Sequence, residues 1–201
     1  MDAGPVELRV LGCLIEKQRT TPDQYPLSLN ALRLACNQAT SRDPVTDLDE
    51  SEIRDALERL HRRGWSRLAS GAGSRATKYR HLLDEALGLS DAELSLLAVL
   101  MLRGPQTPGE LKGRAERLHA FASVTDVIEA LEGLAARELV ARQSRRPGQK
   151  EDRYAQLLGG EQAPAPVETP VASGPSRLEV LEQRVAALEH ELRSLHERFG
   201  R

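Results

Sequence analysis

Aromatic side chains are scarce in this 201-residue chain, at 3% of all residues, although hydrophobic residues make up 40%. A core must therefore be built from Leu, Val, Ile and Ala, which favours helices over a β-sandwich rich in aromatic residues. No charge of one sign dominates, because the formal net charge is −2. This balance argues against indiscriminate binding of polyanions but leaves room for a local basic face.

The chain also lacks a long apolar run at its start, where Glu7 and Arg9 interrupt the hydrophobic residues and no basic region precedes them. We therefore expect neither a signal peptide nor a membrane span, and a cytoplasmic location. The two cysteines, Cys13 and Cys36, have no CxxC or Cys/His metal spacing. We expect them to be small buried thiols.

Catalytic motifs are equally missing. The five histidines are scattered, and His190 and His196 are too far apart for the i, i+4 spacing of a zinc-binding helix. The sequence contains no phosphate-binding loop of the GxxxxGK[ST] type and no GxSxG nucleophile elbow. We therefore expect a protein that is not an enzyme, with no catalytic residues, no metal site and no cofactor.

An internal repeat is the clearest feature of the first 158 residues. Segments 52–70 and 126–144 align without gaps, and apolar residues recur in both with the spacing of one helix face: Ile53, Ala56, Leu57 and Leu60 in the first copy, Val127, Ala130, Leu131 and Leu134 in the second. In each copy two further helical patterns precede this helix, and two short strand patterns follow it. Three helices followed by a hairpin is the order of a winged helix, a variant of the helix-turn-helix module.

The sequence thus predicts a mainly α protein with small β-hairpins, organised as tandem winged-helix domains. We expect domains at residues 1–88 and 89–158. Residues 159–175 are rich in Pro, Ala and Gly and predict a flexible linker. Residues 176–201 follow with the pattern of a C-terminal coiled-coil helix.

Three strings also resemble a known bacterial family: TTPDQYPLSLNALRLACNQATSRDPV, RGPQTPGELKGRAERLHAF and PGQKEDRY. They are similar to the YceH-like proteins, a family of unassigned function, and the similarity covers most of residues 6–158. The resemblance implies tandem winged-helix domains, in agreement with the repeat. The resemblance points to no particular ligand or catalytic residue, so it leaves the function open.

Charge along the repeat bears on nucleic-acid binding. The third helices, which carry the base-reading side chains in most winged-helix regulators, are rich in acids such as Asp49, Glu52 and Asp126. The hairpins, or wings, and the second helices are basic instead. We therefore expect duplex DNA to be held by phosphate contacts, in a regulatory role, with these candidate residues: Arg33, Arg42, Arg67, Arg75, Lys78, Arg80, Lys112, Arg114, Arg117, Arg145, Arg146, Lys150 and Arg153.

A second hypothesis stays open. Basic residues on hairpins are commonly solvated or paired with nearby carboxylates, and neither repeat is basic overall: residues 1–88 hold 13 basic and 13 acidic residues, and residues 89–158 hold 10 of each. Tandem winged helices with acidic faces also suit a scaffold or adaptor that binds another protein.

The tail predicts self-association. Apolar residues alternate at spacings of three and four, which gives the a and d positions of a heptad at Leu178, Leu181, Val185, Leu188, Leu192 and Leu195. We expect these residues to form a homodimer through a coiled coil. The alternative is that the same helix packs back on its own winged helices, which the linker is long enough to permit.

Truncation tests the coiled coil. A chain ending near Ser173 lacks every heptad position, so sedimentation should show a monomer where the full chain is a dimer. A truncated chain that remains dimeric would refute the assignment.

Overall fold

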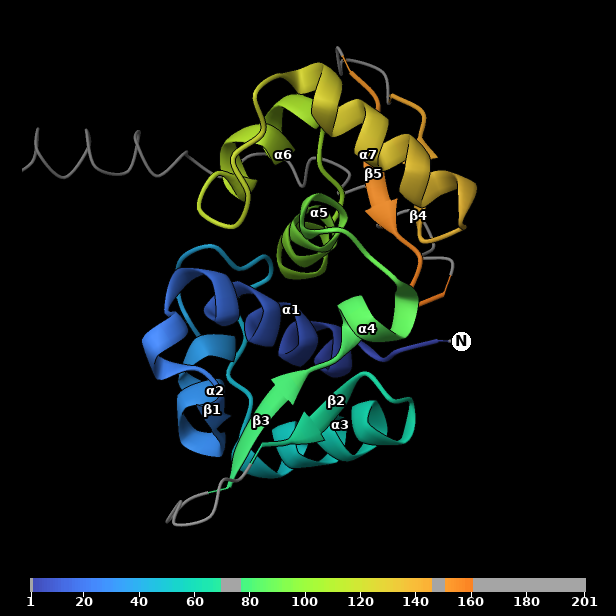
Figure 1. Cartoon of the computed structure of the whole chain (residues 1–201). Helices are drawn as coiled ribbons and strands as arrows, with labels where there is room; N and C mark the ends of the chain where they lie inside the picture. The colour runs from blue at the N-terminus through green and yellow to red at the C-terminus, as the bar shows by residue number, and fades with distance from the viewer. Residues whose placement is uncertain (1, 70–76, 146–150, 161–201) are drawn as a thin grey trace, which may run out of the picture. The chain divides into compact units, whose positions relative to one another are not determined.

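The computed structural model describes residues 2–69, 77–145 and 151–160, which form helices and two small antiparallel sheets (Figure 1). The mainly helical class with small β elements is confirmed. All described residues belong to one compact unit, Met1–Gln162. The predicted heptad positions, and the linker beyond Gly160, lie outside the described residues.

The first half of this unit begins with helix α1 (Pro5–Thr20) and a short 3-10 turn, η1 (Pro22–Gln24). It continues in the order β1 (Leu27–Ser28), α2 (Leu29–Cys36), α3 (Glu50–Arg62), β2 (Ser66–Leu68) and β3 (Lys78–His81). After the connecting helix α4 (Leu83–Leu87), the second half runs α5 (Asp91–Arg103), α6 (Pro108–Ala115), α7 (Val124–Ala136), β4 (Val140–Gln143) and β5 (Arg153–Gln156). Both halves therefore contain three helices and a hairpin in the order that the repeat predicts.

Side-chain caps fix where most of these helices begin. The hydroxyl or carboxylate of the preceding residue accepts a hydrogen bond from an amide of the first turn, as at Ser28, Asp49, Ser90, Thr107 and Ser123. Four of these caps are completed by an acidic residue that binds back to the cap's own amide. Such capping boxes satisfy amides that have no partner within the helix.

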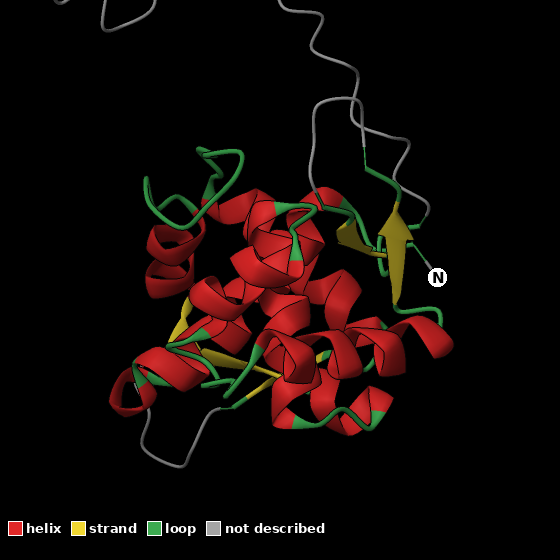
Figure 2. Cartoon of the chain, turned by 90° about the horizontal axis from the view of Figure 1, so that it is seen from above, coloured by secondary structure: helices red, strands yellow, loops and turns green. Residues whose placement is uncertain are grey.

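Helices α1 and α5 form the centre of the unit and lie side by side between the two hairpins (Figure 1). Figure 2 shows the strands on different sides of this helical centre. Every residue of α5 from Leu94 to Leu102 is buried, as is every residue of α1 from Glu7 to Ile15. The two helices approach closely at Gly12, where an added Cβ would lie 2.9 Å from Cγ of Leu102.

The hairpins of the two halves share a pairing that the sequence did not predict. In the first half Leu27 of β1 pairs with Tyr79, which gives a three-stranded sheet in the order β1-β3-β2. In the second half Gln106 forms an isolated bridge with Tyr154 of β5. The next residue caps the second helix in both halves, Ser28 for α2 and Thr107 for α6. These pairings align the two halves residue by residue.

The aligned strands end in a buried polar residue, His81 in β3 and Gln156 in β5. Nε2 of His81 lies 2.6 Å from Oε1 of Gln18, and its Nδ1 lies 3.4 Å from Oδ1 of Asp84. Burial lowers the pKa of His81 to about 4. The imidazole is therefore neutral at physiological pH, and protonation would place an unsolvated charge beside the core.

Acid should destabilise the protein through this group. Because its pKa is about 6.5 when unfolded and about 4 when folded, the stabilisation is complete above pH 6.5 and is lost as the pH falls toward 4. From pH 7.5 to pH 5 the loss should be about 2 kcal/mol.

Urea unfolding at the two pH values checks this for His81→Gln, which copies Gln156 of the second half. The variant should lose less stability on acidification than the wild type by that amount. His61→Gln, at an exposed position, serves as the matched control. Equal pH dependence in His81→Gln and wild type would contradict the assignment.

Candidate nucleic-acid interface

The outer face of the first sheet carries a cluster of cations. Arg67 pairs with Arg80 across β2 and β3, and Lys78 pairs with Ser28 across β3 and β1. Because side chains alternate along a strand, these four residues share one face, while Leu27, Leu68 and Tyr79 share the other. Arg80 is neutralised by Glu85, with Nη2 and Oε1 2.5 Å apart. Within the described residues, Arg67 and Lys78 form no ion pair.

The cations of the second hairpin are neutralised by nearby carboxylates. Arg153 aligns with Lys78, but its Nη1 lies 3.0 Å from Oε2 of Glu110 and donates to the carbonyl of Pro105 at 2.8 Å. Arg142, exposed on the same hairpin, is held by Asp152 at 2.5 Å. The amide of Arg145 donates to this carboxylate, and that bond together with the guanidinium of Arg142 holds the pKa of Asp152 below its usual range.

One position explains the difference between the two faces. The cap of α2 binds the amide of Ala31, and the cap of α6 binds the amide of Glu110, so these two residues occupy the same helical position. The second half thus has a carboxylate beside its strand cation, and the first half has a methyl group there. The first turn of α2 contains no acidic residue. Lys78 pairs with Ser28, the cap of α2, and so lies opposite the N-terminus of this helix. The partial positive charge of the helix N-terminus adds to the charge of Lys78.

The N-termini of the third helices are acidic, as the sequence predicts. Amides of Glu52 and Ser51 donate to Asp49 and hold its pKa below the ordinary value. The hydroxyl and amide of Ser123 do the same for Asp126 of α7. Both carboxylates are exposed and ionised at neutral pH, so these helix ends repel phosphate.

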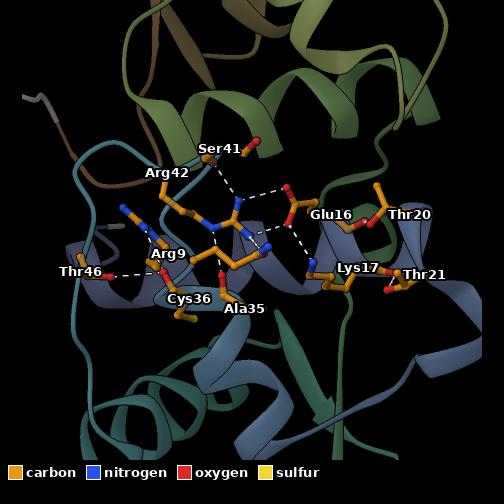
Figure 3. A network of polar contacts seen from close by, with 11 residues as sticks. Arg9, Glu16, Lys17, Thr20, Thr21, Ala35, Cys36, Ser41, Arg42 and Thr46 are labelled. Carbon is orange, nitrogen blue, oxygen red and sulfur yellow. Dashed lines mark hydrogen bonds and ion pairs between the residues drawn. The ribbon is translucent and has the colours of Figure 1, made fainter.

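Arg42 lies inside the protein, which removes it from any binding surface. Its side chain is 0% exposed, and its guanidinium binds both oxygens of Glu16, at 3.0 and 2.5 Å. It also donates to the carbonyls of Ala35 and Ser41, at the end of α2 and just after it (Figure 3). The sequence predicted a phosphate contact at Arg42, and this prediction is wrong. The carboxylate of Glu16 and the carbonyls of Ala35 and Ser41 already accept the hydrogen bonds of the guanidinium.

The remaining predicted contacts differ in availability. Arg33 donates to Asn30 and is half-buried, and Arg114 pairs with Glu110 at 3.7 Å. Lys112 is half-buried, and Arg117 and Arg145 are exposed. The guanidinium or ammonium groups of these last three form no ion pair inside the described ranges. Three further candidates, Arg75, Arg146 and Lys150, lie outside the described residues.

The sequence reasoning missed the contrast between Ala31 and Glu110. Aligning the two halves at their helix caps, rather than by hydrophobic spacing alone, would have found it. The stretches SLNA and TPGE place the two residues three positions after Ser28 and Thr107. The signal was therefore present in the sequence, at the third residue after each cap.

Two further observations concern ligands and membranes. Among the described residues, no three His, Cys, Asp or Glu side chains are placed so that they could hold a metal ion. None of the helices in residues 2–69, 77–145 and 151–160 has the length and hydrophobicity needed to cross a bilayer.

Comparison with known proteins places this chain in a family. Residues 4–149 match the family described as "Protein of unknown function, DUF480". The chain belongs to this family.

Three relatives cover nearly the whole chain. A UPF0502 protein of Serratia proteamaculans is 46% identical over 96% of this chain and 94% of its own length. A UPF0502 protein of Geobacter sulfurreducens is 50% identical over 94% of this chain and 88% of its own. The UPF0502 protein YceH of Salmonella newport is 46% identical over 96% of both chains. The predicted resemblance to YceH-like proteins is confirmed.

Unfolding measurements test the placement of Arg42. Arg42→Ala removes the two-oxygen contact of Glu16, which keeps only the 3.9 Å ion pair with Lys17, and leaves the buried carbonyl of Ala35 without this donor. The substitution should therefore lower the free energy of unfolding by about 3 kcal/mol. Arg33→Ala, at a half-buried position of α2, should cost less than about 1 kcal/mol. Equal costs for the two variants would contradict the buried network.

Proposed function

We propose that the protein is a tandem winged-helix protein that binds duplex DNA through phosphate contacts made by its first half. The observation that carries the proposal is the outer face of the first sheet, where Arg67 and Lys78 have no carboxylate partner among the described residues and Lys78 lies opposite the cap of α2. Helix N-termini flanked by cations are common phosphate-binding sites. On the hairpin beside this three-helix unit Arg67 is exposed and Lys78 is half-buried, and cations in this position agree with the backbone contacts of a wing.

The same charges argue for weak sequence discrimination. Phosphate contacts fix the position of a protein on the duplex but carry no direct base information. The ionised carboxylates of Asp49 and Asp126 occupy the helix ends that would enter a major groove. Binding should therefore be strongly salt-dependent and tolerant of sequence. A regulatory role then depends on the predicted dimer, because two linked sites raise the effective concentration on one duplex.

Titration of a fluorescent 20-base-pair duplex tests this proposal. Lys78→Gln should weaken binding by roughly fivefold, the equivalent of about 1 kcal/mol, and should lower the slope of log K against log salt by about 1. The substitutions Arg145→Ala, Arg146→Ala and Lys150→Ala together test whether the second wing adds contacts. An absence of binding at low salt would refute the proposal.

An exchange between the halves gives the matched control. Ala31→Glu installs the carboxylate of the second half beside Lys78 and should weaken binding as Lys78→Gln does. Glutamate at this position completes a capping box, so the helix should remain stable. The reciprocal Glu110→Ala releases Arg153 and should strengthen binding. If both exchanges leave affinity unchanged, the first sheet is not the contact surface.

A second candidate function is a protein-binding adaptor. It is favoured by a cavity of about 660 Å³ beside α7 and the second hairpin, lined by Val124, Ile128, Glu132, Arg145 and Tyr154 among others. Val124 is 40% exposed, and apolar surface bordered by charges is typical of protein contacts. Glu132 lines this cavity, and Glu129 is a further acidic residue of α7. An adaptor would lose its partner in pulldown when these two residues are neutralised, whereas DNA affinity would not fall.

A further inference from the structure

A second cavity, of about 250 Å³, lies between α1, α5 and the segment that follows α2. Its apolar wall includes four buried residues, Leu8, Leu48, Leu100 and Met101. Arg9 and Thr46 contribute polar groups to the lining. A mainly apolar wall with a few polar groups is the usual composition of a small-molecule site, and the volume limits the ligand to a small one.

Arg9 is the unusual member of this lining. The residue is only 5% exposed, and its guanidinium donates to two neutral groups, the carbonyls of Cys36 at 3.2 Å and Pro44 at 2.6 Å. Neighbouring Arg42 has Glu16 as its counter-ion, whereas Arg9 forms no ion pair with a carboxylate in the described part of the chain (Figure 3). A guanidinium has five N–H donors, so two carbonyls leave donors for a ligand.

Electrostatics indicates what such a ligand would bring. A buried charge without a counter-ion is costly, and burial lowers the pKa of Arg9 for this reason. The charge of nearby Arg42 lowers this pKa further, and the carboxylate of Asp43 offsets the lowering only in part. An anion in the cavity would therefore be stabilised by a cation that is already desolvated and held in place. Charge-assisted hydrogen bonds to a planar carboxylate suit the guanidinium best.

We propose that this cavity binds a small organic carboxylate, whose anionic group is held by Arg9 and whose apolar body lies against Leu8, Leu100 and Met101. Asp43 also lines the cavity and is exposed. The carboxylate of Asp43 would accept hydrogen bonds from an ammonium group that the ligand carries next to its own carboxylate. Two sources of the same chemistry therefore fit, a simple branched acid and an apolar amino acid.

Calorimetric titration of the full chain with three matched probes tests the proposal. 4-Methylpentanoate has the required carboxylate and apolar body, 4-methylpentan-1-ol lacks the charge, and leucine adds an ammonium group. The acid should bind saturably and at least roughly tenfold more tightly than the alcohol, because it gains the charged hydrogen bonds. The relative affinity of leucine and 4-methylpentanoate distinguishes the two sources.

Three variants keep the test independent of folding. Val6 lines the cavity, so Val6→Phe should fill it and weaken binding of the acid by at least tenfold. Val45→Phe is the matched control, at a 57% exposed position that does not line it. Arg9→Met should abolish the preference for acid over alcohol.

Absence of saturable binding, equal affinity for acid and alcohol, or binding unchanged in Val6→Phe would overturn the proposal. Lys78 and Ala31 do not line this cavity, so the outcome is separate from the test of DNA binding.

Discussion

The packing of α1 against α5 is the constraint on which the other elements depend. Both helices are buried over most of their length, and Gly12 lets them approach where a larger residue would collide with Leu102. The second and third helices of each half can bury one face only, because the other carries their charged residues. They therefore gain a core by covering the central pair, and each hairpin extends the cover on its own side.

Within this frame, small differences in side chains decide what each half offers to a partner. Lys78 and Arg153 occupy aligned positions on equivalent strands, yet one has no carboxylate partner among the described residues and the other is bound by Glu110. At both sites the next residue of the strand pairs with the residue before a helix cap, so the contrast comes from the side chain three residues after that cap. A repeat can thus retain its fold while one copy keeps a charged surface and the other neutralises it.

The sequence predicted the main helices and both hairpins, but not which partner each charged side chain would find. Hydrophobic spacing at Ile53 and Leu57, and at their counterparts in the second copy, predicts α3 and α7 because burial of one helix face produces that pattern directly. The burial of Arg42 could not be predicted in this way, because it depends on the ion pair with Glu16. Glu16 lies far from Arg42 in the sequence and comes close to it only when α1 and α2 pack together. The two-residue strand β1 was missed because so short a segment has no periodicity of its own.

The all-round burial of α1 and α5 has a consequence for how such a chain could arise. A single half, on its own in water, would expose the mainly apolar side of α1 or α5 that is now buried, and would cover it most simply with a second copy of itself. Joining two such copies end to end turns an interface between molecules into an interior. Within one chain the two halves can then differ in sequence, as they do at Ala31 and Glu110.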